Sequence, residues 1–299
     1  MIEMMVSIAI FSFIMIGIYF FFDTGRWMYL HSERKANQQE NGRLAIEGME
    51  REMRMIGLGI PSGTRITDNL TWNPPIIYGT VNSIGFRGDM DSYNAIVTQD
   101  IASGDTQIHV DQPTYVCPQA GTNLLIVDSG RNWQSTTCNS TAAGVINVSP
   151  GAQQAFAVAD TEIFAPIQVF YRFSPDTDAN GICDQDSATI PDYSQCIIER
   201  AEERSLDPLA APSNDNLWQV YATNIQKFQL SYFRKTSAGY QAIGSPLVAL
   251  SNSVDVIRIL ITAKDRSAFG KEIVRVANSP QEYQTTDFTT DVLIRKHRY

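Results

Sequence analysis

The nine residues 176–184, DTDANGICD, place oxygen-bearing side chains at alternate positions of a glycine-containing turn. Asp176, Asp178 and Asn180 fall at positions 1, 3 and 5 of an EF-hand-type calcium loop, and a glycine follows at position 6, where such a loop turns sharply. Ile182 would offer its backbone carbonyl at position 7, and Asp184 would bind directly or through water at position 9. Because hard oxygen donors suit Ca²⁺, this spacing predicts a structural calcium site with the weak affinity of extracellular modules.

The calcium pattern departs from its usual form at position 12, where Ser187 replaces the expected acidic residue. Asp186, Asp192 or Glu199 would supply the missing carboxylate if the chain folds back over the loop. We expect no helix pair around the loop, so a bound ion would be structural and would not operate a sensor switch. The alternative interpretation is a turn rich in Asp, Asn and Gly that fits the pattern by coincidence.

A second chemically unusual residue is Glu3, which precedes nineteen uncharged, mostly apolar residues, 4–22. As an α-helix this run would be roughly 28 Å long, close to the hydrocarbon thickness of a bilayer. A carboxylate at the start of such a segment is costly in lipid and usually has a function and a partner. We therefore expect 4–22 to be a transmembrane segment and Glu3 to be functional; a glutamate resting at the lipid edge is the alternative.

Four cysteines lie in polar, turn-rich stretches beyond the apolar segment, and their even number indicates two disulfides formed in an oxidising compartment. Three pairings are possible, and we favour the sequential one because both loops then close locally. Each bridge would stabilise the fold by roughly 3 kcal/mol. Four reduced, buried thiols are the alternative. The residues are Cys117, Cys138, Cys183 and Cys196.

The apolar segment continues as a predicted helix to about residue 57, first polar over 31–43 and then amphipathic. Ile46, Met49, Met53 and Ile56 recur at helical spacing and should dock the helix onto its own globular region. Glycines at 57 and 59 and a proline at 61 are typical of a helix end. The helical domain is therefore expected to span 1–57.

Residues 58–299 carry the signals of a β-rich globular domain. Apolar residues alternate with polar ones near 167–173, 228–232 and 257–261, and 288–294 reads as a final strand. The stretch 62–160 is rich in turn-forming residues with brief apolar runs, which predicts loops and small additional strands. The expected fold class is α+β, with a long N-terminal helix packed on an antiparallel sheet-rich domain.

Composition and motifs exclude several function classes. The net charge of −9 and pI near 4.8 argue against nucleic acid as a partner, since phosphate binding needs clustered Lys and Arg. The sequence contains no G-x-S-x-G elbow, no H-E-x-x-H and no Walker loop, so we expect a protein that is not an enzyme.

The orientation in the membrane receives two opposing signals. Arg26, Arg34 and Lys35 follow the apolar segment, which by the positive-inside rule would leave the large domain in the cytoplasm. The cysteines indicate the opposite side. We give the cysteines more weight, because a basic leader is expected to precede residue 1.

The run IEMMVSIAI at residues 2–10 resembles the N-terminal segment of type IV pilins and pseudopilins. In that family a Gly-Phe peptidase site is followed by a Thr-Leu-Ile-Glu run, and the glutamate is fifth in the mature protein. Glu3 corresponds to it, so two mature residues, the cleavage glycine and the leader would lie upstream. The helix end at 46–57, IEGMEREMRMIG, is similar to that of PilW-type minor pilins, as are the VFYRF and FQLSY strands at 169–173 and 228–232.

The resemblance implies a pilin-like fold and a non-catalytic subunit that helps to initiate, prime or cap type IV pilus assembly. Glu3 would neutralise the N-terminal amine of a neighbouring subunit. The implied partners are other minor pilins, the major pilin, a tip adhesin, the inner-membrane assembly machinery and the prepilin peptidase. The protein would reside in the inner membrane before assembly and then at the tip, or at low abundance, in a pilus that crosses the periplasm to the cell exterior.

Two alternatives to the minor pilin remain open. The J-type pseudopilin of type II secretion has similar strand patterns, although it is generally a smaller protein. A membrane-anchored surface protein that binds calcium is the second alternative, and under it Glu3 would be replaceable without loss of function.

Overall fold

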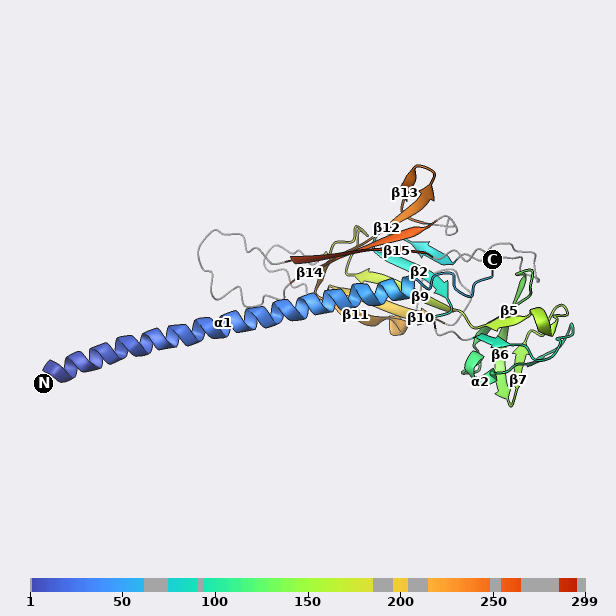
Figure 1. Ribbon diagram of the computed structural model, residues 1–299, viewed down its shortest axis with the longest axis horizontal. Helices are drawn as coiled ribbons and strands as arrows, with labels where there is room; N and C mark the ends of the chain where they lie inside the picture. Colours follow the sequence, from blue (N-terminus) through green and yellow to red (C-terminus); the bar gives the residue numbers. More distant parts are fainter. Residues whose placement is uncertain are drawn as a thin grey trace.

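A single long helix leads into a β-rich region. The computed structural model describes residues 2–61, 75–90, 94–184, 196–203, 215–247, 254–264 and 285–294. Helix α1 (Ile2–Met53) projects from the molecule over its first half and lies against β-sheets over its second half (Figure 1). The strands pair in antiparallel fashion throughout the described residues. The expected α+β layout is therefore confirmed.

The second half of α1 docks through the apolar stripe that the sequence predicts. The four stripe residues at 46, 49, 53 and 56 are at most 7% exposed and belong to the largest hydrophobic cluster. Gln38 also joins the helix to the sheets, because its side-chain amide donates a hydrogen bond to the carbonyl of Ala263 at 2.7 Å. The chain leaves the helix through Gly57 and Gly59, whose φ angles of +79° and +70° favour glycine.

A five-stranded sheet in the order β1-β2-β9-β10-β11 forms one wall of this core. The central strand β9 is the alternating strand predicted near 167–173, but it is buried on both faces. Tyr171 packs into the cluster shared with α1, whereas Phe170 packs on the other face with Trp218, just after the short helix η3 (Asp215–Leu217). The strands are β1 (Ile76–Gly79), β2 (Ser83–Gly88), β9 (Ile167–Ser174), β10 (Ile197–Glu203) and β11 (Gln219–Thr223).

A four-stranded sheet in the order β13-β12-β14-β15 forms the other wall. Its three longer strands are the ones predicted near 228–232, 257–261 and 288–294. Helix α1 contacts β14 and β15 of this sheet and β11 of the first sheet, so it closes the core between them (Figure 1). The strands are β12 (Ile225–Thr236), β13 (Gly239–Ile243), β14 (Val256–Lys264) and β15 (Thr285–Leu293).

A third sheet of six strands is inserted between β2 and β9, which pair directly with each other through Gly88 and Ile167. The brief apolar runs of 62–160, predicted as loops and small strands, are here gathered largely into one sheet with its own hydrophobic cluster. This sheet lies at the end of the molecule away from the N-terminus (Figure 1). Its order is β3-β8-β5-β6-β7-β4, and its elements are β3 (Asn94–Ile96), β4 (Gln107–His109), α2 (Pro113–Val116), β5 (Asn123–Val127), β6 (Trp133–Ala142), β7 (Val145–Ser149), η1 (Val158–Asp160) and β8 (Glu162–Phe164).

Two disulfides join the cysteines in sequential order. Cys117 pairs with Cys138 inside the inserted sheet region, with Cα atoms 6.2 Å apart. Cys183 pairs with Cys196 within the main core, with Cα atoms 6.0 Å apart. This is the pairing that the sequence favoured, because each bridge closes a short loop, of 21 and 13 residues in separation.

Candidate assembly helix and acidic loop

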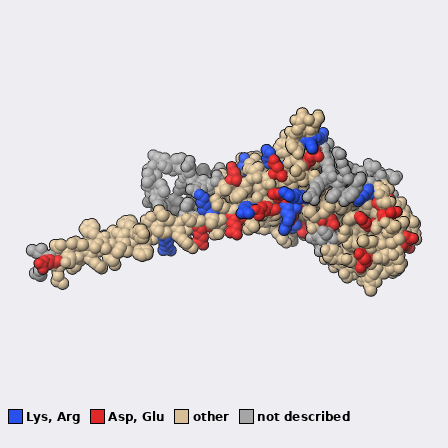
Figure 2. Space-filling view, viewed as in Figure 1, with Lys and Arg blue, Asp and Glu red and all other residues tan. Residues whose placement is uncertain are grey.

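The apolar segment 4–22 of α1 is uncovered. Its large side chains are between 46% exposed at Ile18 and 79% exposed at Phe21. Figure 2 shows it as a rod without charge except for an acidic residue near its tip. Among the described residues, α1 is the helix long and apolar enough to cross a membrane. A rod of this length needs lipid or other apolar helices around it.

The two serine hydroxyls within this segment are satisfied by the helix itself. The hydroxyl of Ser7 donates a hydrogen bond to the carbonyl of Glu3 at 2.9 Å, and that of Ser12 donates to the carbonyl of Ile8 at 2.8 Å. These bonds to the carbonyl four residues earlier remove the need for water. The segment is thereby compatible with an apolar surrounding along its length.

Glu3 lies exposed in the first turn of α1. The backbone N–H groups of that turn have no partner within the helix and give the N-terminal end a partial positive charge, which favours a nearby carboxylate. The carboxylate stands at the end of the apolar rod and away from the globular region (Figure 2). It is therefore placed to meet a group from outside this chain.

A polar stretch separates the apolar segment from the globular region. Tyr29 is 69% exposed, and Lys35 and its neighbours at 36 and 37 are also exposed, whereas Gln38 is buried. The distance along the helix from residue 22 to residue 38 is about 24 Å at 1.5 Å per residue. If 4–22 spans a bilayer, the helix holds the sheets clear of the headgroups.

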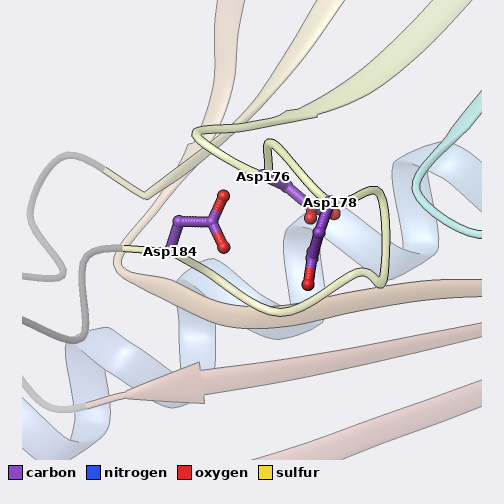
Figure 3. Close-up of side chains that lie close together, drawn as sticks. All are labelled: Asp176, Asp178 and Asp184. Atoms are coloured by element: carbon purple, nitrogen blue, oxygen red, sulfur yellow. The ribbon is translucent and has the colours of Figure 1, made fainter.

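The acidic loop brings three carboxylates together. One side-chain oxygen from each of Asp176, Asp178 and Asp184 lies within 4.8 Å of the others. Asp176 and Asp178 lie side by side, and Asp184 faces them from the returning strand of the loop (Figure 3). Three carboxylates in so small a volume repel one another, and a divalent cation bound by hard oxygen atoms would relieve that repulsion.

Backbone N–H groups shape the loop around these carboxylates. Asp176 accepts hydrogen bonds from the N–H of Asn180 at 3.1 Å and from the N–H of Gly181 at 2.7 Å. Gly181 has φ of +79°, and a Cβ there would collide with the backbone carbonyl of Phe228, so the position requires glycine. The glycine that the calcium pattern places at position 6 therefore also allows the loop to approach β12.

One of the five expected ligands, Asn180, does not offer its side-chain oxygen to the carboxylate cluster. The side-chain oxygen of Asn180 accepts a hydrogen bond from the N–H of Ile182 at 2.6 Å, and its amide nitrogen donates to Asp178 at 2.6 Å. Asn180 would have to rotate to offer its oxygen to an ion. Ile182 forms an isolated antiparallel bridge with Lys227, which ties this part of the loop to β12.

The surroundings of the carboxylates shift two pKa values in opposite directions. Burial raises the pKa of Asp176, and the neighbouring Asp178 adds to the rise, although hydrogen bonds from Gly181 and Asn82 oppose it. The pKa of Asp184 is lowered because its carboxylate accepts hydrogen bonds from the hydroxyl and the backbone N–H of Thr177. The loop thus holds at least one carboxylate firmly in its charged form.

Of the candidate ligands for position 12 of the calcium loop, only Glu199 lies within the described residues. Ser187, Asp186 and Asp192 lie outside the described residues. Glu199 is in β10, where its carboxylate accepts a hydrogen bond from Arg172 at 2.7 Å and is thereby engaged away from an ion. The Cys183–Cys196 bridge nevertheless holds the beginning of β10 close to the loop.

One functional arrangement was missed by the sequence analysis. Glu52, at the end of α1, accepts a hydrogen bond from the hydroxyl of Tyr171 at 2.7 Å and from the guanidinium of Arg200 at 3.0 Å. Burial and the negative charge of Glu52 raise the pKa of Tyr171 well above its ordinary value. Burial acts to lower the pKa of Arg200, but the charge of Glu52 and its hydrogen bond raise it overall. This arrangement fixes the helix to β9 and β10. The run of acidic and basic residues at 47–54 is the sequence feature that could have indicated it.

In comparisons with known proteins, no family model, no curated protein and no solved structure is significantly similar to this chain.

Proposed function

We propose that this protein is a PilW-type minor pilin, a non-catalytic subunit that helps to initiate, prime or cap a type IV pilus. The observation that carries this proposal is the division of α1 into an uncovered apolar half and a half built into the core. A helix of this kind can exchange lipid for a bundle of similar helices without refolding its own globular region. The resemblance of residues 2–10 to pilin N-termini supports the same conclusion.

The proposal assigns Glu3 the role of pairing with the N-terminal amine of a neighbouring subunit. Glu3→Ala and Glu3→Gln should leave the protein in the inner membrane but reduce pilus number, since an unpaired amine in an apolar bundle costs several kcal/mol. Glu40→Gln is the matched control, because Glu40 is an exposed carboxylate on the polar part of the same helix. The measurement is surface pilus counts by electron microscopy together with the membrane level of each variant.

Normal piliation with Glu3→Ala would favour the membrane-anchored surface protein over the pilin. Recovery of the protein as the bulk constituent of filaments would contradict its minor role. In the proposed role it acts with other minor pilins, the major pilin, a tip adhesin and the inner-membrane assembly machinery.

Processing by a prepilin peptidase supplies a separate test. The N-terminal mass spectrum of the protein from its native cells should show a methylated residue two positions upstream of residue 1. An unprocessed start, or cleavage after the apolar segment, would contradict the proposal. A deletion strain then separates the two family members, because loss of piliation and twitching indicates a minor pilin and loss of protein secretion indicates the J-type pseudopilin.

We also propose that the acidic loop holds a structural Ca²⁺ through Asp176, Asp178 and Asp184. Binding at a calcium concentration of 100 times Kd should stabilise the fold by about 2.7 kcal/mol, and a chelator should remove that gain. Asp178→Asn combined with Asp184→Asn should abolish the calcium-dependent rise in Tm, whereas Asp160→Asn, an exposed control in η1, should retain it. Absence of binding heat at millimolar Ca²⁺ in calorimetry would refute the site.

A further inference from the structure

The hairpin formed by β12 and β13 stands away from the body of the molecule (Figure 1). Strand β14 pairs with β12 only as far as Phe233, so residues 234–236 continue beyond the sheet with β13 as their partner. The side chains from 234 to 246 are exposed or half-buried, and Tyr240 at the tip is 56% exposed. Within the described part of the chain both faces of this hairpin are open, and a two-stranded hairpin is marginal alone and gains stability from a further strand.

Strand β13 is the end strand of its sheet in the described structure, with β12 as its neighbour on one side. Alternate residues of such a strand direct their N–H and C=O groups outward, where they can pair with another chain. Soluble proteins usually protect an edge with charged residues or proline within the strand. The sequence of β13, GYQAI, contains neither, so this edge is suited to accept an added strand.

The charge of the hairpin indicates what kind of strand it accepts. Residues 234–246 contain two cations, Arg234 and Lys235, and no Asp or Glu, although the whole chain carries a net charge of −9. The register places Lys235 opposite Tyr240 and Arg234 opposite Gln241, so one cation lies beside the edge strand on each face of the hairpin. Asp255 accepts a hydrogen bond from the backbone N–H of Lys235 at 2.7 Å, but it precedes β14 and so lies on the side of β12 away from β13. Carboxylates on a strand added to β13 would therefore favour its binding.

We propose that β13 docks an extended, acidic segment of another protein by strand addition, with Arg234 and Lys235 selecting its charge. The hydrogen bonds of the added backbone would supply affinity, and the two cations would supply specificity. Anionic lipid is a poorer occupant, because headgroups offer no row of alternating N–H and C=O groups at strand spacing, and the apolar segment of α1 lies far along the molecule from the hairpin (Figure 1). Docking here would occur whether or not α1 enters a filament.

Photo-crosslinking of the full-length protein in its native membrane tests this proposal. The probe is p-benzoylphenylalanine in place of Tyr240, an exposed aromatic whose replacement leaves the core intact. Irradiation should give one protein adduct, and peptide mass spectrometry should map it to a segment rich in Asp or Glu and free of helix. Arg234→Glu with Lys235→Glu should lower the yield of this adduct about tenfold, which corresponds to roughly 1.4 kcal/mol.

Lys35→Glu with Arg51→Glu is the matched control, because it makes the same change in net charge at exposed positions of α1. This control should retain the adduct, and the Arg234→Glu, Lys235→Glu variant should melt at the same temperature as the unaltered protein. The proposal is overturned by the absence of an adduct at 240, by a yield that charge reversal leaves unchanged, or by an adduct to lipid or to a second copy of this chain. Because piliation is not the readout, failure here leaves the proposed function standing.

Discussion

At the scale of single residues, Glu52 is the side chain that joins the helix to the first sheet. It is polar and lies at the edge of an apolar core, so its carboxylate must be compensated by hydrogen bonds. Tyr171 and Arg200 provide them from β9 and β10, and Arg200 also contacts Glu202 at 3.2 Å. The arrangement sets the rotation of α1 about its axis, because only one helical position can present a carboxylate to both donors.

Replacing Glu52 should therefore destabilise the globular region. Glu52→Gln should lower the free energy of unfolding by about 1–3 kcal/mol, since Arg200 loses its main partner in a partly buried place. Glu47→Gln is the control, because the Glu47–Arg43 pair is exposed and its attraction is screened by solvent, so its loss should matter less than that of Glu52. Denaturant unfolding followed by tryptophan fluorescence measures both, and equal losses would contradict the role of Glu52.

Buried tyrosines make the fold sensitive to alkaline pH. Burial raises the pKa of Tyr232 well above its ordinary value, and Tyr232 also donates a hydrogen bond to the carbonyl of Thr80 at 2.9 Å. The folded state holds this proton more tightly than the unfolded chain, whose tyrosine pKa is about 10. The resulting stabilisation is complete below that pH and is lost as the pH rises toward the folded-state pKa.

Tyr232→Phe should consequently reduce the loss of stability above pH 10. Each such tyrosine contributes up to about 1.4 kcal/mol per pH unit to the slope, while removal of its hydrogen bond costs about 1 kcal/mol at neutral pH. Tyr240→Phe, at an exposed position, is the matched control. Unfolding free energies measured from pH 8 to pH 11 would show whether the two variants differ as expected.

At the scale of elements, α1 fits its sheets because glycine occurs at two contact positions. Gly42 faces the ring of Phe288 on β15, and Gly48 faces the hydroxyl of Tyr221 on β11. A Cβ at either position would collide with the facing side chain. Glycine weakens a helix by up to about 1 kcal/mol relative to alanine. The close packing of the strands against the helix compensates for this lower helix propensity.

A change from glycine to alanine usually stabilises a helix, but at these two positions it should destabilise the protein. Gly42→Ala should destabilise the globular region by about 1–3 kcal/mol, because overpacking outweighs the gain in propensity. Gly25→Ala serves as the control, since nothing lies within 4 Å of a Cβ there, and it should be neutral or slightly stabilising. Stabilisation by Gly42→Ala in thermal unfolding would show that the contact with Phe288 can relax without loss.

At the scale of the whole molecule, the six-stranded sheet is a separate body inserted into the core fold. Its hydrophobic cluster shares no residue with the cluster that contains α1. The chain enters it after β2 and leaves it before β9, and these two strands are already neighbours. The core fold therefore does not need the insertion in order to complete its sheet.

Removal of the insertion should leave a folded protein. If Asn-Gly replaces residues 91–164, β2 and β9 become a hairpin, and the remainder should unfold cooperatively with the Cys183–Cys196 bridge intact. The converse fragment, 91–166, should fold alone with the Cys117–Cys138 bridge. Circular dichroism melts and mass spectrometry of the disulfides test both pieces, and an aggregated or non-cooperative remainder would show that the two bodies depend on each other.

The sequence by itself determined the features that depend on neighbouring residues. The length and end of α1 follow from an uncharged run, a helical stripe and the glycines after it, all of which act within a few turns. Strands β9, β12 and β14 follow from alternation, which two faces of a strand impose locally. The two disulfides also follow from short sequence separations, because nearby cysteines meet at little entropic cost.

Only the tertiary structure decided which distant residues meet. Glu52 lies 119 residues before Tyr171 and 148 before Arg200, and no local pattern specifies that these three side chains converge. The short strands between 94 and 164 likewise form one inserted sheet through pairs that are distant in sequence, such as β3 with β8. Within the acidic loop, the spacing predicted three converging carboxylates but not the orientation of Asn180, whose side-chain oxygen accepts a hydrogen bond from the N–H two residues later in a local turn. Local periodicity can be recognised from neighbouring residues, whereas long-range contacts depend on the packing of the whole chain.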